Sequence, residues 1–423
     1  MRAPVPGHPD TAQPAMRSKS SLAGQGGGNP ILEAIDAGRR DSFGAGGSAG
    51  RTGLRAVSSA VRWDSPMARA EPLLGKAFHG YYLFRRLAGS ARRNPSVALM
   101  DRYRDEFYAQ AWRDAAATIE AAIAPLGNNF FRITRGTKTI CVNRNISPID
   151  NGAAVLLADD KPATHRMLVA AGIPVPQHRV IAAGDQAAAL EFLSAGPSPI
   201  VVKPAAGTAG GNGVSTNVAT AADLRHAIGW AGAYGRRILL ERQIAGETYR
   251  LLFFRGELLD CVVRRSPRLV GDGRAAVSGL VRLENERRLA AGYQRSQSLL
   301  VIDRDMNTTL ASQGLRLGTV PAAGREFVVK QVVNENRGME NETATDRLCD
   351  AVVTLGRRTL EALDLRLAGI DIITPDLTLP LDIAGGAVVD VNPSPGFYYH
   401  YCKKDGCLPV ASHLLHGIFD HDV

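Results

Sequence analysis

The sequence predicts a protein of the α+β class that follows a low-complexity tail. Three kinds of pattern lead to this prediction: apolar residues at helical spacing, short apolar runs typical of buried strands, and pairs of such runs joined by turn residues. The chain has 423 residues, of which 45% are hydrophobic and 22% are charged. These values are ordinary for a globular protein, and the length allows two or three domains.

Residues 1–70 are predicted to form a disordered tail. They are rich in Gly, Ala, Ser, Pro and Arg, contain few large apolar residues and include glycine-dense runs at 26–28 and 44–50. Such a segment cannot bury enough apolar surface to offset the entropy lost on ordering. Translation from Met16 or Met67 would remove part or most of this tail, and N-terminal sequencing of the native protein would identify the start.

A small N-terminal α/β domain is expected at residues 71–155. Apolar residues recur at helical spacing across residues 102–124, which predicts a helix. Two β-rich runs at 130–134 and 137–142 are separated by Arg135-Gly136, and this arrangement predicts a β-hairpin.

Residues 156–423 are predicted to form the main domain. Asp160 can cap a helix that carries Pro162 in its first turn and ends near Gly172. The other elements expected here are helices at 186–194 and 345–363, a strand at 200–204, a strand around Glu241, a hairpin formed by 250–254 and 257–263, and two C-terminal strands around 369–373 and 388–392.

The two C-terminal strands each place a polar side chain inside an apolar run. Asp371 lies in the first strand, and Asp390 and Asn392 lie two residues apart in the second, so that both face the same side. If the strands are neighbours, three oxygen ligands converge, and such hard ligands suit Mg²⁺ bridged to nucleotide phosphates. The alternative is a pair of ordinary core strands whose acids end at solvent.

A glycine-dense loop follows the strand that ends at Lys203. Residues 205–214 include Gly210, Gly211 and Gly213, whose backbone N–H groups can approach phosphate oxygens closely. Lys203 supplies a point charge beside them. No Gly-Lys-Ser/Thr follows, so the loop is not a Walker A motif, and glycine-rich loops alone are weak evidence.

Taken in order, these motifs resemble the ATP-grasp superfamily, and in particular the ligase region of cyanophycin synthetases. The similarity covers roughly residues 155–400. The motifs, in chain order, are Asp160-Lys161-Pro162, Ile173-Pro174-Val175-Pro176, Val201-Val202-Lys203-Pro204, the glycine loop, Leu240-Glu241-Arg242, Glu247-Thr248-Tyr249-Arg250, Arg264-Arg265-Ser266-Pro267, Val270-Gly271-Asp272-Gly273, Thr343-Ala344-Thr345-Asp346, Gly369-Ile370-Asp371 and Asp390-Val391-Asn392.

The resemblance implies a fold of two α/β lobes that hold ATP between antiparallel sheets, and it implies roles for particular residues. These are Lys161, Lys203 and the loop glycines for the phosphates, Glu241 for adenine, Glu247 for the ribose, Arg250 and Arg264 for catalysis, and Asp371, Asp390 and Asn392 for Mg²⁺. Two ions are expected, with Mn²⁺ as an alternative metal. Two positions differ from the family pattern, because Asp390 replaces the usual Glu and Thr248 occupies the usual place of the ribose-binding acid.

The function implied by this resemblance is an ADP-forming carboxylate–amine ligase that works through an acyl phosphate. Its partners would be a small-molecule carboxylate and an amine, such as an amino acid or peptide, with a homodimer as a possible assembly. Two alternatives stay open: a non-catalytic ATP-binding sensor or scaffold, and a phosphotransferase on the same fold. The sequence does not identify the acid or the amine.

Charge, cysteine and hydropathy patterns argue against other classes. Residues 1–110 hold 16 Lys and Arg against 9 Asp and Glu, so most of the net charge of +9 lies outside the main domain and nucleic-acid binding is not expected. The five Cys residues are scattered, and His400, Cys402 and Cys407 lack a fourth zinc ligand. The sequence shows neither a long apolar run nor a secretory signal, so no membrane association and a cytoplasmic location are expected.

Overall fold

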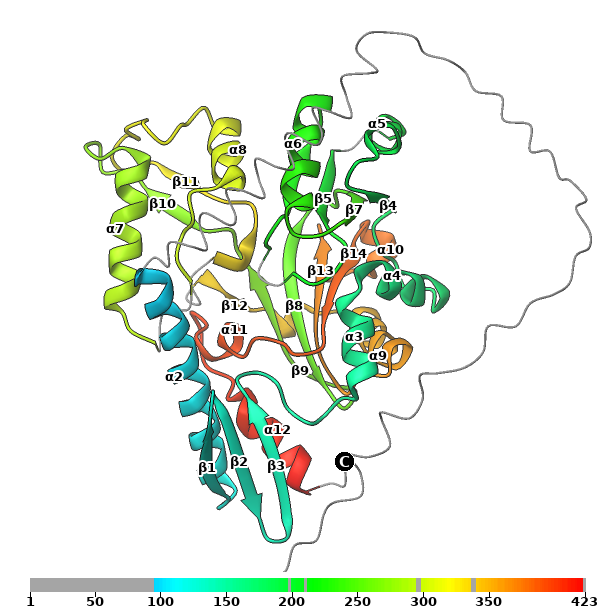
Figure 1. The fold of residues 1–423 in the computed structure, drawn as a ribbon, viewed down its shortest axis with the longest axis vertical. Coiled ribbons are helices and arrows are strands. Elements are labelled where there is room, and N and C mark those ends of the chain that lie inside the picture. The colour runs from blue at the N-terminus through cyan, green and yellow to red at the C-terminus, as the bar shows by residue number, and fades with distance from the viewer. Residues whose placement is uncertain (1–94, 197–198, 209–210, 294–297, 336–339, 421–423) are drawn as a thin grey trace, which may run out of the picture. The chain divides into compact units, whose positions relative to one another are not determined.

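The computed structural model describes residues 95–196, 199–208, 211–293, 298–335 and 340–420. All of them belong to one of the two units into which the chain divides. The predicted tail, both candidate start methionines and Gly210 lie outside the described residues. Four β-sheets organise the described part of the chain (Figure 1).

The first sheet has three antiparallel strands and packs with two helices near the ends of the described chain. Its elements are β1 (Ala122–Gly127), β2 (Phe130–Arg135), β3 (Lys138–Asn143), α2 (Pro95–Thr118) and α12 (Val410–Asp420). The predicted hairpin is confirmed by the pairing of β2 with β3. Its core also includes Leu252, Leu367 and Phe397 from other parts of the fold. The domain boundary at residue 155 therefore stays a prediction.

The predicted helix at 102–124 was too long at its C-terminal end. The helix ends at Thr118, and Glu120 adopts a left-handed backbone conformation with φ of 54°. Ile123 then pairs with Ile133 across the first two strands. The apolar residues at 119 and 123 fit helical spacing. The backbone N–H and C=O groups of residues 122–127 nevertheless form their hydrogen bonds with β2 and not within a helix.

The second sheet is antiparallel, with its strands in the order β4-β7-β5-β6. The strands are β4 (His178–Ala182), β5 (Ile200–Pro204), β6 (Ser215–Val218) and β7 (Arg237–Arg242). Two helices, α5 (Gln186–Ser194) and α6 (Ala221–Gly232), share its hydrophobic core. The predicted helix at 186–194 and the strand ending beside the glycine loop are confirmed.

The third sheet carries most of the predicted polar residues. Its strands follow the order β12-β9-β8-β13-β14, and all its pairings are antiparallel. They are β8 (Glu247–Phe254), β9 (Glu257–Arg264), β12 (Glu342–Thr343), β13 (Leu367–Thr374) and β14 (Ala387–Asn392). The predicted hairpin of β8 with β9 and the adjacency of the two C-terminal strands are confirmed.

Three helices share a hydrophobic core with one face of this third sheet. They are α3 (Gly152–Asp159), α4 (Lys161–Ala170) and α9 (Asp350–Leu363). The Asp160 carboxylate accepts a hydrogen bond from the N–H of Ala163, which confirms the predicted cap of α4. The helix predicted at 345–363 starts later, at Asp350, because residues 345–347 form a 3₁₀ turn and Leu348 is extended. The opposite face of the sheet carries Arg250 and Asp371.

A fourth, two-stranded sheet and two helices form a smaller structural unit that the sequence patterns did not predict. Its elements are β10 (Arg268–Val270), β11 (Glu326–Val328), α7 (Val277–Ala290) and α8 (Arg304–Ser312), and they have their own hydrophobic core. The short helices α10 (Leu381–Ala384) and α11 (Tyr398–Tyr401) complete the fold. Among the described helices, none is long and apolar enough to cross a membrane.

Buried charges attach this smaller unit to the segment that follows β11. Lys330 is buried, with its Nζ 2.6 Å from Asp303 Oδ2 and 2.8 Å from Glu335 Oε1. Asp305 Oδ2 accepts the N–H of Val332 at 3.1 Å, whereas its buried Oδ1 has no partner. Burial raises the pKa of Asp305 to about 6, although the Val332 N–H opposes this shift.

The Asp305→Asn variant is expected to be more stable than the wild type above pH 6. When folding raises the pKa of an acid, the native state becomes less stable as the pH rises. The loss begins near the pKa of the acid in the unfolded chain, about 4, and is complete above its pKa in the folded protein. The gain at pH 8 should be about 1–3 kcal/mol and should disappear near pH 4. Thermal melts at both pH values measure it. Asp303→Asn is the control, because it loses an ion pair with Lys330 and should destabilise; equal melting curves for Asp305→Asn and wild type at pH 8 would contradict the prediction.

Candidate nucleotide and metal site

A cavity of about 540 Å³ lies where the second and third sheets meet. It brings together residues that are far apart in the sequence, including ten of the residues singled out in the sequence analysis. These are Lys161, Lys203, Gly211, Glu241, Glu247, Arg250, Arg264, Asp371, Asp390 and Asn392. Gly213 lies in the loop beside the cavity but does not line it.

Strand register explains why the C-terminal polar residues meet. Asp371 on β13 pairs directly with Asp390 on β14, and Gly369 pairs with Asn392. On the other side of β13, Asp371 pairs with Arg250 of β8. Directly opposed residues point to the same face of a sheet, so one face gathers all these side chains.

Asp371 forms a two-pronged ion pair with Arg250. Arg250 Nε and Nη2 donate to Asp371 Oδ1 and Oδ2 at 2.5 and 2.8 Å, and both side chains are buried. Arg264 Nη1 lies 3.6 Å from Asp371 Oδ2. Burial alone would raise the pKa of Asp371, but Arg250 and then Arg264 outweigh it and lower this pKa. Asp371 is therefore an anion at neutral pH.

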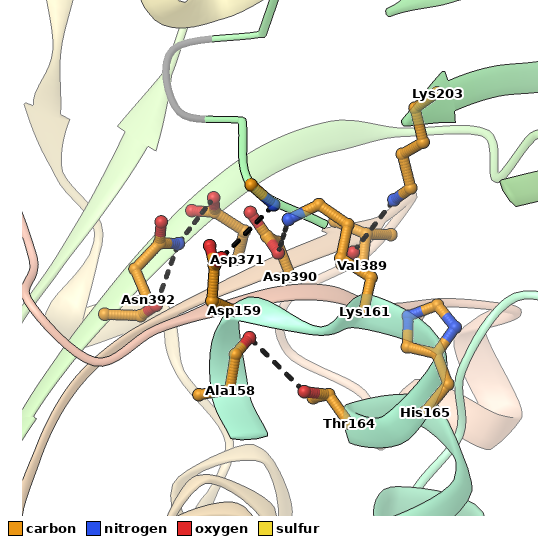
Figure 2. Close-up of polar contacts among 12 residues, drawn as sticks. Ala158, Asp159, Lys161, Thr164, His165, Lys203, Asp371, Val389, Asp390 and Asn392 are labelled. Carbon is orange, nitrogen blue, oxygen red and sulfur yellow. Dashed lines mark hydrogen bonds and ion pairs between the residues drawn. The ribbon is translucent and has the colours of Figure 1, made fainter. Parts of the chain in front are cut away.

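Asn392 and Asp390 complete a patch of oxygen-bearing side chains (Figure 2). Asn392 Nδ2 lies 3.3 Å from the Gly369 carbonyl and 3.5 Å from Asp371 Oδ2. Within the described ranges there is no cluster of three His, Cys, Asp or Glu that could hold a metal, so a third protein ligand would be another oxygen group, for which the Asn392 amide is placed beside the two acids. A carboxylate has about four lone-pair sites, and Arg250 uses only two on Asp371. This donor set therefore fits a hard divalent cation.

Two lysines reach toward the same patch from the other side of the cavity. Lys161 Nζ lies 2.7 Å from Asp390 Oδ1, and Lys203 Nζ donates to the Val389 carbonyl at 3.3 Å (Figure 2). Burial opposes the charge on Lys161, but Asp390 outweighs it and raises the pKa of this lysine. Lys161 is therefore a cation, and the ammonium groups of both lysines are held next to β14, where an oxyanion could replace their present partners.

Glu241 lies behind Lys203 in a buried polar group that also contains His165. Glu241 Oε2 is 2.7 Å from Lys203 Nζ, while its buried Oε1 has no hydrogen-bond partner. His165 Nε2 is 3.7 Å from this oxygen. Burial, followed by the charge of Lys203, lowers the pKa of His165 to about 3, so its ring is neutral. The sequence reasoning missed His165, although it lies one helical turn after Lys161 on the same face of α4.

The glycine loop reaches the cavity in a conformation that needs glycine. Gly211 and Gly213 have φ of +77° and +78°. A Cβ on Gly211 would lie 2.6 Å from Val332 and 2.9 Å from Asn334, so the segment after β11 packs directly on the loop. The Gly207 N–H donates to Asp159 Oδ2 at 3.2 Å and ties the other end of the loop to the end of α3.

Replacing Gly213 by Ala is expected to destabilise the protein by about 2–4 kcal/mol. The positive φ is unfavourable for an L-residue, and the new Cβ would lie 2.7 Å from Pro204 Cγ. Gly207→Ala is the matched control, because its φ is +72° but nothing lies within 4 Å of the new Cβ. That variant should lose only about 1–2 kcal/mol. Urea denaturation measures both, and equal losses would contradict the predicted clash.

Glu247, the residue predicted to bind ribose, lies at the start of β8. The β8 ladder is regular around this position, so no bulge turns the side chain. Its carboxylate accepts the Tyr249 hydroxyl at 3.0 Å and lies 3.6 Å from Arg265 Nη1. Successive side chains of a strand point to opposite faces, so Thr248 points to the face that carries Arg250, and Glu247 points to the other face. Ribose binding by Glu247 stays a prediction.

Arg264 has contacts that the sequence did not indicate. Its Nη2 donates to Asn334 Oδ1 at 2.5 Å, and its buried Nε has no hydrogen-bond partner. The ring of Tyr399 lies 4.3 Å from its guanidinium carbon. Asn334 and Tyr399 were missed because neither lies in a recognisable motif or regular periodic pattern.

Comparison with known proteins confirms the similarity to cyanophycin synthetases that the sequence predicted. The cyanophycin synthetase of Nostoc sp. is 31% identical over 272 residues, which cover 63% of this chain and 30% of that protein. The glutathione biosynthesis bifunctional protein GshAB of Listeria innocua is 28% identical over 302 residues, covering 70% and 38%. The chain thus spans about 30% of the length of the cyanophycin synthetases that it matches.

The solved structures to which the chain is similar include a bifunctional glutathione synthetase from Pasteurella multocida. It superposes with a TM-score of 0.48 and 20% identity, covering 72% of this chain and 43% of that one. No family model matches the chain.

Proposed function

We propose that this protein binds ATP with a divalent metal and uses it to join a carboxylate to an amine, releasing ADP and phosphate. One observation carries the proposal. Lys161, Lys203, Arg250 and Arg264 surround a single cavity that also contains Asp371, Asp390 and Asn392. Four cations beside an oxygen ligand set match the needs of phosphoryl transfer, which depends on charge neutralisation and alignment.

The nucleotide would lie with its phosphates at the two lysines and its base near Glu241. The buried Glu241 Oε1 is an acceptor without a partner, and a buried acceptor of this kind is costly unless a ligand satisfies it. The exocyclic amine of adenine is a suitable donor, whereas guanine presents a carbonyl at that position. The site is therefore expected to prefer ATP over GTP.

Asp371, Asp390 and Asn392 would hold Mg²⁺, or Mn²⁺ in its place. When bound, the metal would neutralise phosphate charge. The number of ions, two by the family resemblance, is part of the proposal. Arg250 would keep Asp371 ionised and oriented for this role, since it occupies one lone pair on each carboxylate oxygen.

The chemical step needs no nucleophile from the protein. A carboxylate oxygen of the substrate attacks the γ-phosphorus; the new O–P bond forms as the bond to the β–γ bridging oxygen breaks and ADP leaves. The amine then attacks the acyl carbon, phosphate leaves, and the amine proton passes to solvent. Arg250 and Arg264 would bind the transferred phosphoryl oxygens, because guanidinium groups pair well with oxyanions.

Amino acids or peptides are the substrates that we propose to test first. The names of the relatives, cyanophycin synthetase and glutathione biosynthesis protein, support that chemical class for the acid and the amine. Neither name identifies the substrates of this chain.

The purified full-length chain should be incubated with Mg-ATP and a panel of amino acids and peptides. ADP and phosphate released only when both an acid and an amine are present, with an amide product detected by mass, would support the proposal. ATP binding without amine-dependent ADP release would favour the non-catalytic alternative, and a stable phosphorylated product would favour a phosphotransferase. Failure to bind ATP at all would overturn the proposal.

A further inference from the structure

Tyr399 lies beside both arginines of the site but belongs to neither sheet. It is part of α11, after the chain has left β14. The guanidinium carbon of Arg264 lies 4.3 Å from the centre of its ring, and that of Arg250 lies 5.8 Å away. Both distances are within the range of cation–π attraction.

Contacts on two sides hold α11, and with it the Tyr399 ring, in place. His400 is buried, and its Nδ1 lies 2.8 Å from Asp260 Oδ2 on β9. Lys403 Nζ donates to the same oxygen at 2.9 Å. Tyr398 and Tyr401 pack edge-on against Phe107 of α2 at 5.8 and 5.3 Å between ring centres. The residues on either side of Tyr399 are thus fixed to β9 and to α2.

Arg264 has particular need of such a neighbour. Arg250 has the close contacts with Asp371, whereas Arg264 lies 3.6 Å from that carboxylate and its close polar contact is with the neutral Asn334 amide. The side chain of Arg264 is only 2% exposed, so water does not solvate it freely. The face of an aromatic ring stabilises a guanidinium without using its N–H groups, so the Tyr399 ring adds to the hydrogen bond from Nη2 to Asn334 and does not compete with it.

We propose that Tyr399 is a positioning residue for phosphoryl transfer: its ring orients Arg264 and Arg250 toward the oxygens of the γ-phosphoryl group. This inference rests on the proposed function. It assigns the aromatic ring, rather than the hydroxyl, as the part that matters. Tyr399→Phe should therefore behave as wild type, while Tyr399→Leu should not.

The test measures the binding of two probes to full-length protein, a non-hydrolysable ATP analogue and ADP, each with Mg²⁺. Tyr399→Leu should weaken binding of the ATP analogue by roughly two- to twentyfold, the range of a partly desolvated cation–π contact. Binding of ADP should change little, because ADP lacks the γ-phosphoryl group. Tyr399→Phe should bind both probes as wild type does.

Tyr401→Leu is the matched control for lost packing. Tyr401 is on the same short helix, but it contacts Phe107 and accepts the Ala411 N–H instead of facing the arginines. The Tyr401→Leu variant should lower the melting temperature without changing the ratio of the affinities for the ATP analogue and for ADP. In an Arg264→Met background, Tyr399→Leu should have a much smaller effect, since the closer of its two cation–π contacts is already lost.

An unchanged affinity ratio in Tyr399→Leu, alongside normal binding by wild type, would overturn this inference and leave the proposed function standing. A loss in Tyr399→Phe equal to that in Tyr399→Leu would also overturn it, because the hydroxyl would then be responsible. If wild type binds neither probe, the proposed function and this inference fail together.

Discussion

The Asp390→Ala variant is expected to lower ADP formation by roughly a hundredfold or more while the chain stays folded. Asp390 lines the cavity, and its side chain is 26% exposed, so its removal leaves no large void. The variant would lose one oxygen of the proposed metal site, and it loses the hydrogen-bond partner of Lys161. Both losses would weaken the hold on the triphosphate and leave the packing of the core unchanged. The rate of ADP formation should therefore fall strongly, while the melting temperature changes little.

Asn392→Ala should have a similar effect on ADP formation, because it removes the amide oxygen from the same ligand set. Asp382→Ala is the control for a change in acidic charge, since Asp382 is an exposed residue of α10 outside the cavity lining. Coupled-enzyme assays of ADP and thermal melts give both readouts. If the Asp390 and Asn392 variants both kept full turnover, the metal assignment would be wrong.

The Arg250→Met variant is expected to lose about 3–5 kcal/mol of stability. The change leaves the Asp371 carboxylate buried without its main partner, and a buried unpaired charge is strongly unfavourable. The double variant Arg250→Met/Asp371→Leu should recover most of this loss because both charges are gone. Urea denaturation at pH 7 measures each variant. Arg179→Met is the control, as its pair with Glu191 is exposed and should contribute little.

The cost of Arg250→Met should also depend on pH. Folding lowers the pKa of Asp371, so the stabilisation from this pair is present above the unfolded pKa, about 4, and is lost as pH falls through the folded value. The difference between variant and wild type should therefore shrink in acid. A variant as stable as wild type at pH 7, or a difference that grows in acid, would contradict the assignment.

Local sequence signals predicted the elements that carry the site. The alternation of Asp390 and Asn392 predicted a strand with both side chains on one face, and β14 confirms it. Asp160 followed by Pro162 predicted the start of α4, which fixes the position of Lys161. These predictions succeeded because caps and strand alternation depend on residues a few positions apart.

Contacts between distant segments could not be read from the same signals. The pair formed by Arg250 and Asp371 joins residues 121 apart and depends on the register of β8 with β13. The packing of Asn334 near Gly211 depends on the unit built from β10, β11, α7 and α8, which no motif indicated. Tyr399 reaches the site only because α11 folds back onto β9. Such contacts are set by tertiary packing, which overrides local preference.

The most direct test of the central claim is a crystal structure of the protein with Mn²⁺ and a non-hydrolysable ATP analogue, in which anomalous scattering locates the metal. The triphosphate should lie between the ammonium groups of Lys161 and Lys203, with metal at Asp371, Asp390 and Asn392. A nucleotide bound outside this cavity, or a metal away from those three side chains, would contradict the account.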